Sequence, residues 1–208
     1  MKRSFDFAIT TYCQAKCRSC ARTNPDTGEK ADWLELRHMD LNVFRTTLEA
    51  AKMDIHSIQF CGEFGDPMMH PDVEQFVEAA LRHSEKVQIN TNGGLRSPDW
   101  YQRMAEKYPQ VLSIKWGIDG TDADTNSKYR EGVDWHRAMA NMRSWFSAGG
   151  AGSWHFIVFD WNWHQIPEAQ SIAADIGCKL DIKVNGRSWG KITPDNLVKA
   201  RAFIGQPS

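Results

Sequence analysis

Three cysteines lie within eight residues near the start of the chain, and their thiols are the groups best suited to hold iron. Cys13, Cys17 and Cys20 follow the spacing C-x3-C-x2-C. A structural zinc site is closed by four protein ligands, whereas a [4Fe–4S] cluster that is held by only three cysteines keeps one iron open. An open iron can bind a substrate or a cofactor, so this segment is a candidate reaction centre.

A zinc site is the plain alternative for the same thiols. Its fourth ligand would be His38 or Asp26, and neither lies at a customary spacing from the cysteines. The sequence therefore favours an iron–sulfur cluster, and a zinc or iron–sulfur binding module without catalysis is the competing interpretation.

The composition is that of an ordinary globular protein. The chain has 208 residues and a formal net charge of −1, which argues against general binding to nucleic acid or to an anionic membrane. No apolar run approaches the roughly 20 residues that a membrane-spanning helix needs, and the first residues do not resemble a secretion signal. Five cysteines, three of them clustered, do not suggest a disulfide framework. We expect a cytoplasmic protein.

Short apolar segments alternate with longer helical patterns six times along the chain. This alternation indicates a parallel sheet with crossover helices. The expected strands are 5–10, 55–60, 86–90, 111–118, 154–159 and 179–184, and the expected helices are 40–53, 71–83, 97–108, 134–148, 167–176 and 194–203.

Polar and apolar residues alternate within these strands. Gln88 and Asn90, for example, oppose Val87 and Ile89. Strands of a doubly wound sheet are buried on both faces and read as continuous apolar runs, so here one face packs on helices and the other meets water or a ligand. We predict an α/β fold, a partial (β/α)6 TIM-like barrel of six parallel strands with outer helices. A closed eight-stranded barrel would have an apolar interior and about 250 residues.

Polar loops follow the carboxyl ends of the first four expected strands, where ligands bind in parallel α/β folds. The cysteine loop follows the first strand, Gly65-Asp66-Pro67 the second, Asn92 the third and Asp119-Gly120 the fourth. We expect these four loops to meet in space.

In this order the motifs resemble those of the radical S-adenosylmethionine (radical SAM) enzymes. The cysteine loop is similar to the cluster motif of that family, and Gly65-Asp66-Pro67 to its Gly-Glu-Pro segment. Ile118-Asp119-Gly120 with Tyr129-Arg130 is similar to its fourth-strand region, and residues 156–166 resemble members that modify peptides or proteins. The resemblance spans roughly residues 5–185. It implies one radical SAM core domain over 1–208, with strands over about 5–184 and a short tail at 185–208.

The resemblance also implies two cofactors and their ligands. The three cysteines would bind three irons of a [4Fe–4S] cluster, and the amino and carboxylate groups of SAM would chelate the fourth. The backbone at Gly65 and the carboxylate of Asp66 would receive the SAM ammonium, and Arg130 would pair with the SAM carboxylate. The candidates for the ribose hydroxyls are Asn90, Asn92, Ser113 and Asp119.

The implied reaction is reductive cleavage of SAM to methionine and a 5′-deoxyadenosyl radical, which takes hydrogen from a substrate. The substrate is an unidentified peptide, protein or small molecule, and the electron would come from a donor such as flavodoxin or ferredoxin. No membrane partner is expected. The resemblance names no catalytic side chain.

Two positions depart from the family pattern. Asp66 stands where the family has glutamate, and Gly117 where it has serine. Both keep open a degenerate member that binds SAM without cleaving it. The chain also lacks the cysteines of the C-terminal domain found in larger peptide-modifying members, so a second cluster is not expected.

Several polar or aromatic residues of the later strands have both a structural and a functional interpretation. Lys115 and Lys183 either form salt bridges with Asp119 and Asp181 inside the polar face or bind substrate. The tryptophans near the last strand ends either wall a substrate pocket or simply pack; they are Trp161, Trp163 and Trp189.

Overall fold

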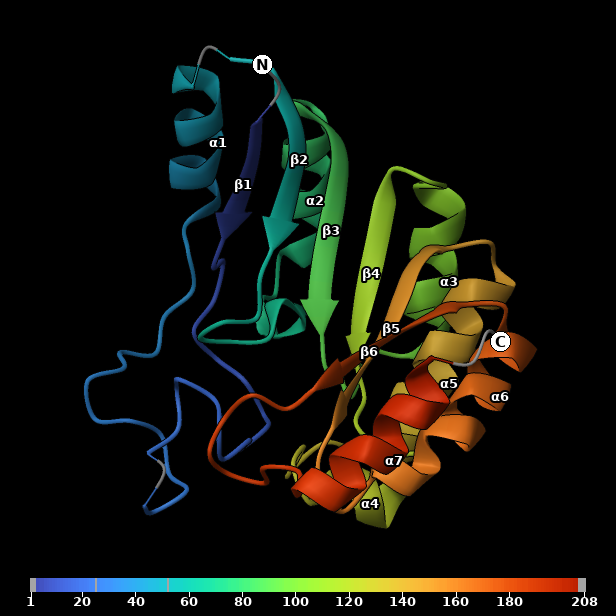
Figure 1. Cartoon of the computed structure of the whole chain (residues 1–208). Helices are drawn as coiled ribbons and strands as arrows, with labels where there is room; N and C mark the ends of the chain where they lie inside the picture. Colours follow the sequence, from blue (N-terminus) through green and yellow to red (C-terminus); the bar gives the residue numbers. More distant parts are fainter. Residues whose placement is uncertain (1–2, 25, 52, 206–208) are drawn as a thin grey trace.

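Six parallel strands form a single sheet in the order β1-β2-β3-β4-β5-β6, as a computed structural model of the chain shows (Figure 1). The structure describes residues 3–24, 26–51 and 53–205. The predicted α/β fold of six parallel strands with outer helices is confirmed. The strands are β1 (Arg3–Phe7), β2 (Ile55–Phe60), β3 (Ser84–Thr91), β4 (Leu112–Gly117), β5 (Ala151–Val158) and β6 (Lys179–Val184).

The six predicted helices are present, and capping side chains fix where several of them begin. Ser97 accepts a hydrogen bond from the backbone N–H of Trp100, and Pro98 occupies the first turn, which suits a residue without an N–H. Lys52, in the predicted helix 40–53, lies outside the described residues. The helices are α1 (Leu41–Ala50), α2 (Val73–Leu81), α3 (Pro98–Lys107), α5 (Trp135–Ser147), α6 (Ile166–Ile176) and α7 (Pro194–Ile204).

Three short elements were not predicted. They are α4 (Ala123–Ser127) and the 3-10 turns η1 (Pro67–Met69) and η2 (Trp163–Gln165). The polar helix α4 has no apolar periodicity to reveal it, and it begins because the Asp122 carboxylate accepts from the N–H of Thr125.

The first strand is shorter than predicted at its carboxyl end. It stops at Phe7 instead of continuing to Thr10. Beyond it the chain leaves β2 and pairs with a later segment: the N–H of Met39 donates to Ile9 O at 2.8 Å, and Thr10 bridges His38. This early departure starts the long cysteine loop, which extends past the strand ends as the blue segment between β1 and α1 (Figure 1).

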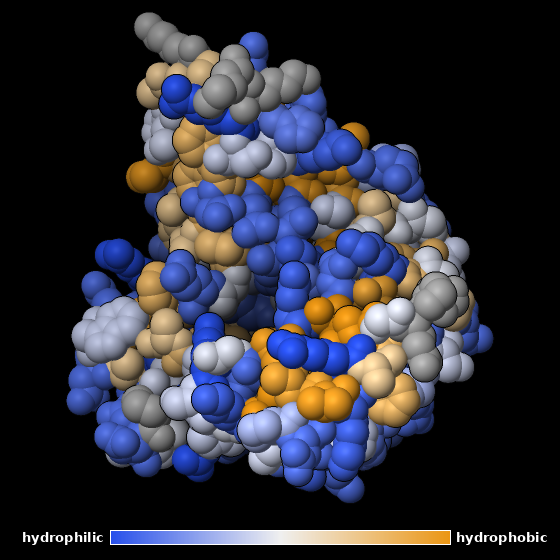
Figure 2. All heavy atoms as spheres, in the orientation of Figure 1, coloured by the Kyte–Doolittle hydropathy of each residue, from blue (hydrophilic) through white to orange (hydrophobic). Residues whose placement is uncertain are grey.

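The two faces of the sheet differ as the alternation predicts. The apolar face carries fully buried side chains such as Ile58, Ile89, Trp116 and Phe156, and α2, α3 and α5 lie behind it (Figure 1). Burial of each such large side chain contributes about 1.5–3 kcal/mol. The other face is polar and half-buried, and the space-filling view shows a hydrophilic hollow there (Figure 2). None of the helices in the described part of the chain combines the length and the apolar character needed to cross a membrane.

Candidate functional site

A cavity of about 440 Å³ opens where the strands end, and it collects most of the predicted site residues. Its volume is in the range of small-molecule binding sites. Eight of the ten predicted residues line it: Cys13, Cys17, Cys20, Gly65, Asp66, Asn90, Asn92 and Arg130. The loops after β1, β2 and β3 therefore do meet in space.

The cysteine loop is fastened by Arg22, a residue that the sequence did not single out. Its Nε donates to Phe64 O at 3.2 Å, its Nη2 to Thr11 O at 3.2 Å, and its Nη1 to the carbonyls of Cys13 and Ala15 at 3.2 and 3.1 Å. Only 8% of this residue is exposed. One guanidinium thus ties the loop that carries the thiols to the loop after β2. The only sequence signal is an arginine two residues after the last cysteine.

The three thiols face the cavity with different degrees of burial. Cys17 is buried, while Cys13 and Cys20 are half-buried. Burial raises the pKa of Cys13 to about 12, and it also raises the pKa of Cys17. Metal binding deprotonates such thiols. Among the described residues, no three His, Cys, Asp or Glu side chains are grouped to hold one metal ion. The donor set of three cysteines on one loop fits a cluster with three protein ligands.

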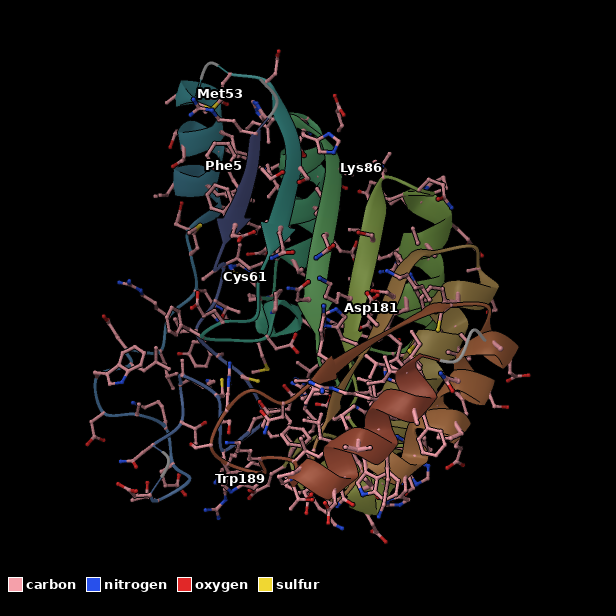
Figure 3. All side chains as sticks on the ribbon, in the orientation of Figure 1. Phe5, Met53, Cys61, Lys86, Asp181 and Trp189 are labelled. Atoms are coloured by element: carbon pink, nitrogen blue, oxygen red, sulfur yellow. The ribbon has the colours of Figure 1, made fainter. Side chains whose placement is uncertain are left out.

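An aromatic cluster packs against this loop. Tyr129 and Phe159 form a small core with Ala15 and Cys17, and Trp161 and Trp189 pack onto it. Trp189 lies in the segment after β6, which passes beside the cysteine loop (Figure 3). Two of the three tryptophans considered above therefore pack beside the cysteine loop.

Trp163 lies apart from this cluster. Its ring stacks on Phe203 of α7, with ring centroids 6.3 Å apart. For Trp163 the packing interpretation therefore holds.

Gly65 is required by a close approach of two chain segments. A Cβ atom at this position would lie 2.3 Å from Thr10 O and 2.7 Å from Tyr12 O, distances that no side chain tolerates. The N–H of Asp66 donates to the same Tyr12 carbonyl at 2.8 Å. The loop after β2 therefore lies directly against the chain that leads into the cysteine loop, with its backbone in the cavity wall.

The Asp66 carboxylate is fully engaged by protein donors. It accepts from the N–H of Met68 at 3.0 Å, from the hydroxyl of Thr91 at 2.9 Å and from the N–H of Asn92 at 2.8 Å. Burial raises its pKa, and these donors oppose the shift. The aspartate thus caps η1 and joins the loop after β2 to the end of β3. The backbone beside it is what remains for a ligand.

Asn92 braces the cysteine loop. Its Oδ1 accepts from Gln14 Nε2 at 2.7 Å and from the N–H of Gly94 at 3.0 Å, while its Nδ2 points to Cys13 Sγ at 3.8 Å. The carboxamide that was a ribose candidate therefore positions a cysteine. Donors near ligand sulfurs tune the reduction potential of iron–sulfur clusters.

Asn90 keeps one group free. Its Oδ1 accepts from Gln88 Nε2 at 2.9 Å, and no described residue accepts from its Nδ2. That N–H group can donate to a hydroxyl or to a carboxylate in the cavity.

The structure does not bring Ser113 or Asp119 to the cavity. The Ser113 hydroxyl donates to Val87 O at 3.4 Å, near the amino end of β4. Asp119 is fully buried, and its carboxylate accepts from Arg130 Nε at 2.6 Å and from the N–H of Ile157 at 2.7 Å. In this structure Asp119 serves to position Arg130.

The departure at Gly117 has a steric explanation. A Cβ atom at this position would lie 2.8 Å from Arg130 Nη2 and 3.2 Å from its Cζ, so the guanidinium occupies the space that a serine would need. Although burial acts to lower it, the Asp119 carboxylate holds the pKa of Arg130 above its ordinary value. Arg130 also opposes the rise in the pKa of Cys17, so a fixed positive charge stands beside the thiol.

A match of the sequence to a family profile agrees with this geometry. The chain belongs to the Radical SAM superfamily, whose profile matches residues 7–168. The cofactors of this family are a [4Fe–4S] cluster and SAM, and the cysteine triad and the cavity fit them. The resemblance seen in the motifs is thereby confirmed.

The curated relatives are longer than this chain. Mycofactocin maturase MftC of Mycobacterium tuberculosis (strain ATCC 25618 / H37Rv) is 25% identical over 193 residues, which are 89% of this chain and 47% of the relative. The MftC of Mycobacterium ulcerans (strain Agy99) is 24% identical over 89% of this chain and 50% of its own. The chain thus spans about half the length of the curated relatives it matches.

Solved structures share the fold at lower identity. Streptococcus suis SuiB bound to S-adenosylmethionine superposes with a TM-score of 0.74 at 16% identity, over 98% of this chain and 47% of that one. SuiB bound to the precursor peptide SuiA gives 0.76 at 17%, over 98% and 45%. Native anSMEcpe with bound AdoMet gives a TM-score of 0.73 at 13% identity, over 95% of this chain and 58% of that one.

Proposed function

We propose that this chain is the SAM-cleaving core of a radical SAM enzyme that modifies a peptide or protein. One observation carries the proposal: three cysteines, Gly65, Asp66 and Arg130 line a single cavity at the carboxyl ends of the strands. The peptide as substrate is supported by similarity to a mycofactocin maturase and to a protein solved with a precursor peptide.

Each residue has a defined task in this proposal. Cys13, Cys17 and Cys20 hold the cluster, and the backbone at Gly65 receives the SAM ammonium. Arg130, held at its Nε by Asp119, presents its remaining N–H groups to the SAM carboxylate. When bound, the cluster and SAM supply one-electron chemistry.

The exposed basic residues on the outer surface of the cysteine loop are suited to an anionic electron carrier. Lys16, Arg18 and Arg187 are exposed around it, and Arg187 donates to the carbonyl of Ser19. Positive charge near the cluster would steer a small acidic donor such as a flavodoxin or ferredoxin. We place the protein in the cytoplasm, because the cluster ligands must stay reduced.

The test is SAM cleavage by the reconstituted protein. The chain is loaded anaerobically with iron and sulfide, reduced and mixed with SAM, and 5′-deoxyadenosine is measured by chromatography. We expect 5′-deoxyadenosine from the wild type and from Cys178→Ala, and none from Cys17→Ala, which should also lose its bound iron. A wild-type protein that carries the full cluster yet releases no 5′-deoxyadenosine would contradict the proposal, and so would Cys17→Ala with full iron content.

A further inference from the structure

Lys115 lies in the cavity wall, and no acidic residue in the described part of the chain pairs with it. The two carboxylates that the sequence offered are engaged elsewhere: Asp119 binds Arg130, and Asp181 lies 2.7 Å from Lys179 Nζ and 3.5 Å from His155 Nε2. No described residue forms an ion pair or hydrogen bond with the Lys115 ammonium. The salt-bridge interpretation of this lysine is therefore wrong, and an unpaired cation faces the cavity.

A second unpaired donor lies directly beside it. Asn90 of β3 is the register partner of Lys115 on β4, and neighbouring strands are about 4.8 Å apart. Both side chains line the cavity, and the Asn90 oxygen is already used by Gln88. The amide N–H2 and the ammonium thus present adjacent donors to one place.

This pair lies deeper in the sheet than the proposed SAM end. Lys115 precedes Gly117 by two residues on the same strand face, and a strand rises about 3.3 Å per residue, so the separation is roughly 6–7 Å. The Arg130 guanidinium packs against Gly117. A ligand on Lys115 would therefore sit behind the groups assigned to SAM, towards the middle of the polar face.

The charges around the pair favour a carboxylate at this side of the cavity. Burial, and after it the nearby Lys115, lower the pKa of His155 on β5, so its ring does not compete as a second cation. Asp6 lines the cavity from β1, three strands away. A ligand that meets Lys115 thus has its anionic group at the β3–β4 side and away from this acid.

We propose that Lys115 and Asn90 form the subsite that binds a carboxylate of the peptide substrate, either an acidic side chain or the chain terminus. The assignment of this carboxylate to the substrate depends on the proposed function. Anion binding by this pair does not depend on the proposed function, and it can be tested without catalysis.

The test uses three small probes of nearly equal size and the reconstituted full chain with SAM bound. Acetyl-glutamate amide carries a side-chain carboxylate, acetyl-glutamine carries a terminal carboxylate, and acetyl-glutamine amide carries none. Binding is measured by saturation-transfer NMR titration, and SAM affinity is followed in parallel. At least one anionic probe should bind ten times more tightly than the neutral probe, and the stronger of the two identifies the source of the carboxylate.

Four variants connect this preference to the pair. Lys115→Met should remove the tenfold preference, and Asn90→Asp should remove it too, because the new carboxylate pairs with the lysine at almost unchanged size. Lys115→Arg should keep most of it. The matched control is Lys86→Met, since Lys86 is an exposed lysine of β3 at the end far from the cysteine loop (Figure 3), and it should behave as the wild type.

Three outcomes would overturn the subsite. The first is the same affinity of the wild type for all three probes. The second is an unchanged preference in a folded Asn90→Asp protein. The third is displacement of SAM by the anionic probe, which would assign Lys115 to SAM. Failure to release 5′-deoxyadenosine overturns the proposed function alone, so the two proposals fail in different experiments.

Discussion

Replacement of Arg22 by methionine should loosen the cysteine loop and lower both stability and iron content. The buried guanidinium donates four hydrogen bonds to the carbonyls of Thr11, Cys13, Ala15 and Phe64. Methionine has no donor and reaches only about as far as Nε of arginine, so the substitution removes the hydrogen bonds and also leaves the space of Cζ and the two terminal nitrogens unfilled.

The size of the effect follows from those contacts. A hydrogen bond from a charged group contributes about 1.5–3 kcal/mol, and a buried acceptor without a partner costs about 1–3 kcal/mol. The four bonds share one side chain, and the loop borders a cavity from which water can reach some carbonyls, so the terms do not simply add. We expect the free energy of unfolding to fall by roughly 3–5 kcal/mol, about the worth of two such hydrogen bonds.

Urea unfolding of the purified chain and its iron content after anaerobic reconstitution provide the assay. The control is Arg103→Met, which removes an exposed ion pair with Glu74 and should cost less than about 1 kcal/mol. Arg22→Lys keeps the charge without the planar fork, and it should recover only part of the loss. An Arg22→Met protein with the stability and the iron content of Arg103→Met would refute the role assigned to this arginine.

Three further predictions test the packing and the charges of the site. Gly65→Ala should weaken SAM binding at least tenfold in equilibrium dialysis, because its Cβ would meet two backbone carbonyls. The control Gly186→Ala, where a Cβ meets nothing within 4 Å, should bind SAM as the wild type does. Equal affinities of the two variants would contradict the close approach at Gly65. Gly117→Ser should displace Arg130 and lower the free energy of unfolding by about 1–3 kcal/mol, and a serine accommodated at no cost would show that the guanidinium is not fixed there. Burial, and after it Lys115, lower the folded-state pKa of His155 below 6.5. The unfolded chain therefore binds more protons, and the free energy of unfolding falls as the pH drops below 6.5. The NMR titration midpoint of His155 should rise in Lys115→Met and stay unchanged in Lys86→Met. An unchanged midpoint in both variants would show that Lys115 does not act on His155.

Much of the fold could be predicted, because the spacing of apolar residues and the residues that begin or end helices are local features of the sequence. The strand β2 has its predicted bounds, and Ser97-Pro98 and Gly177 mark the ends of helices through their own side chains or backbone freedom. The limits of β1 could not be predicted, because Ile9 and Thr10 find partners near residues 38 and 39 that no local pattern reveals.

The sequence by itself determined the chemistry available: three thiols at a fixed spacing, loops of polar residues after successive strands, and one polar face of the sheet. These features depend on residue type and spacing, and they led to the superfamily that the comparison shows.

Only the tertiary structure decided which polar group does what. Asp66, Asn92 and Asp119 all read as candidate ligands, yet in the fold their acceptors are taken by Thr91, Gln14 and Arg130. Arg22 gained its role and Lys115 lost its predicted partners for the same reason. A hydrogen bond depends on atoms a few ångströms apart, and chain segments that are remote in sequence set those distances.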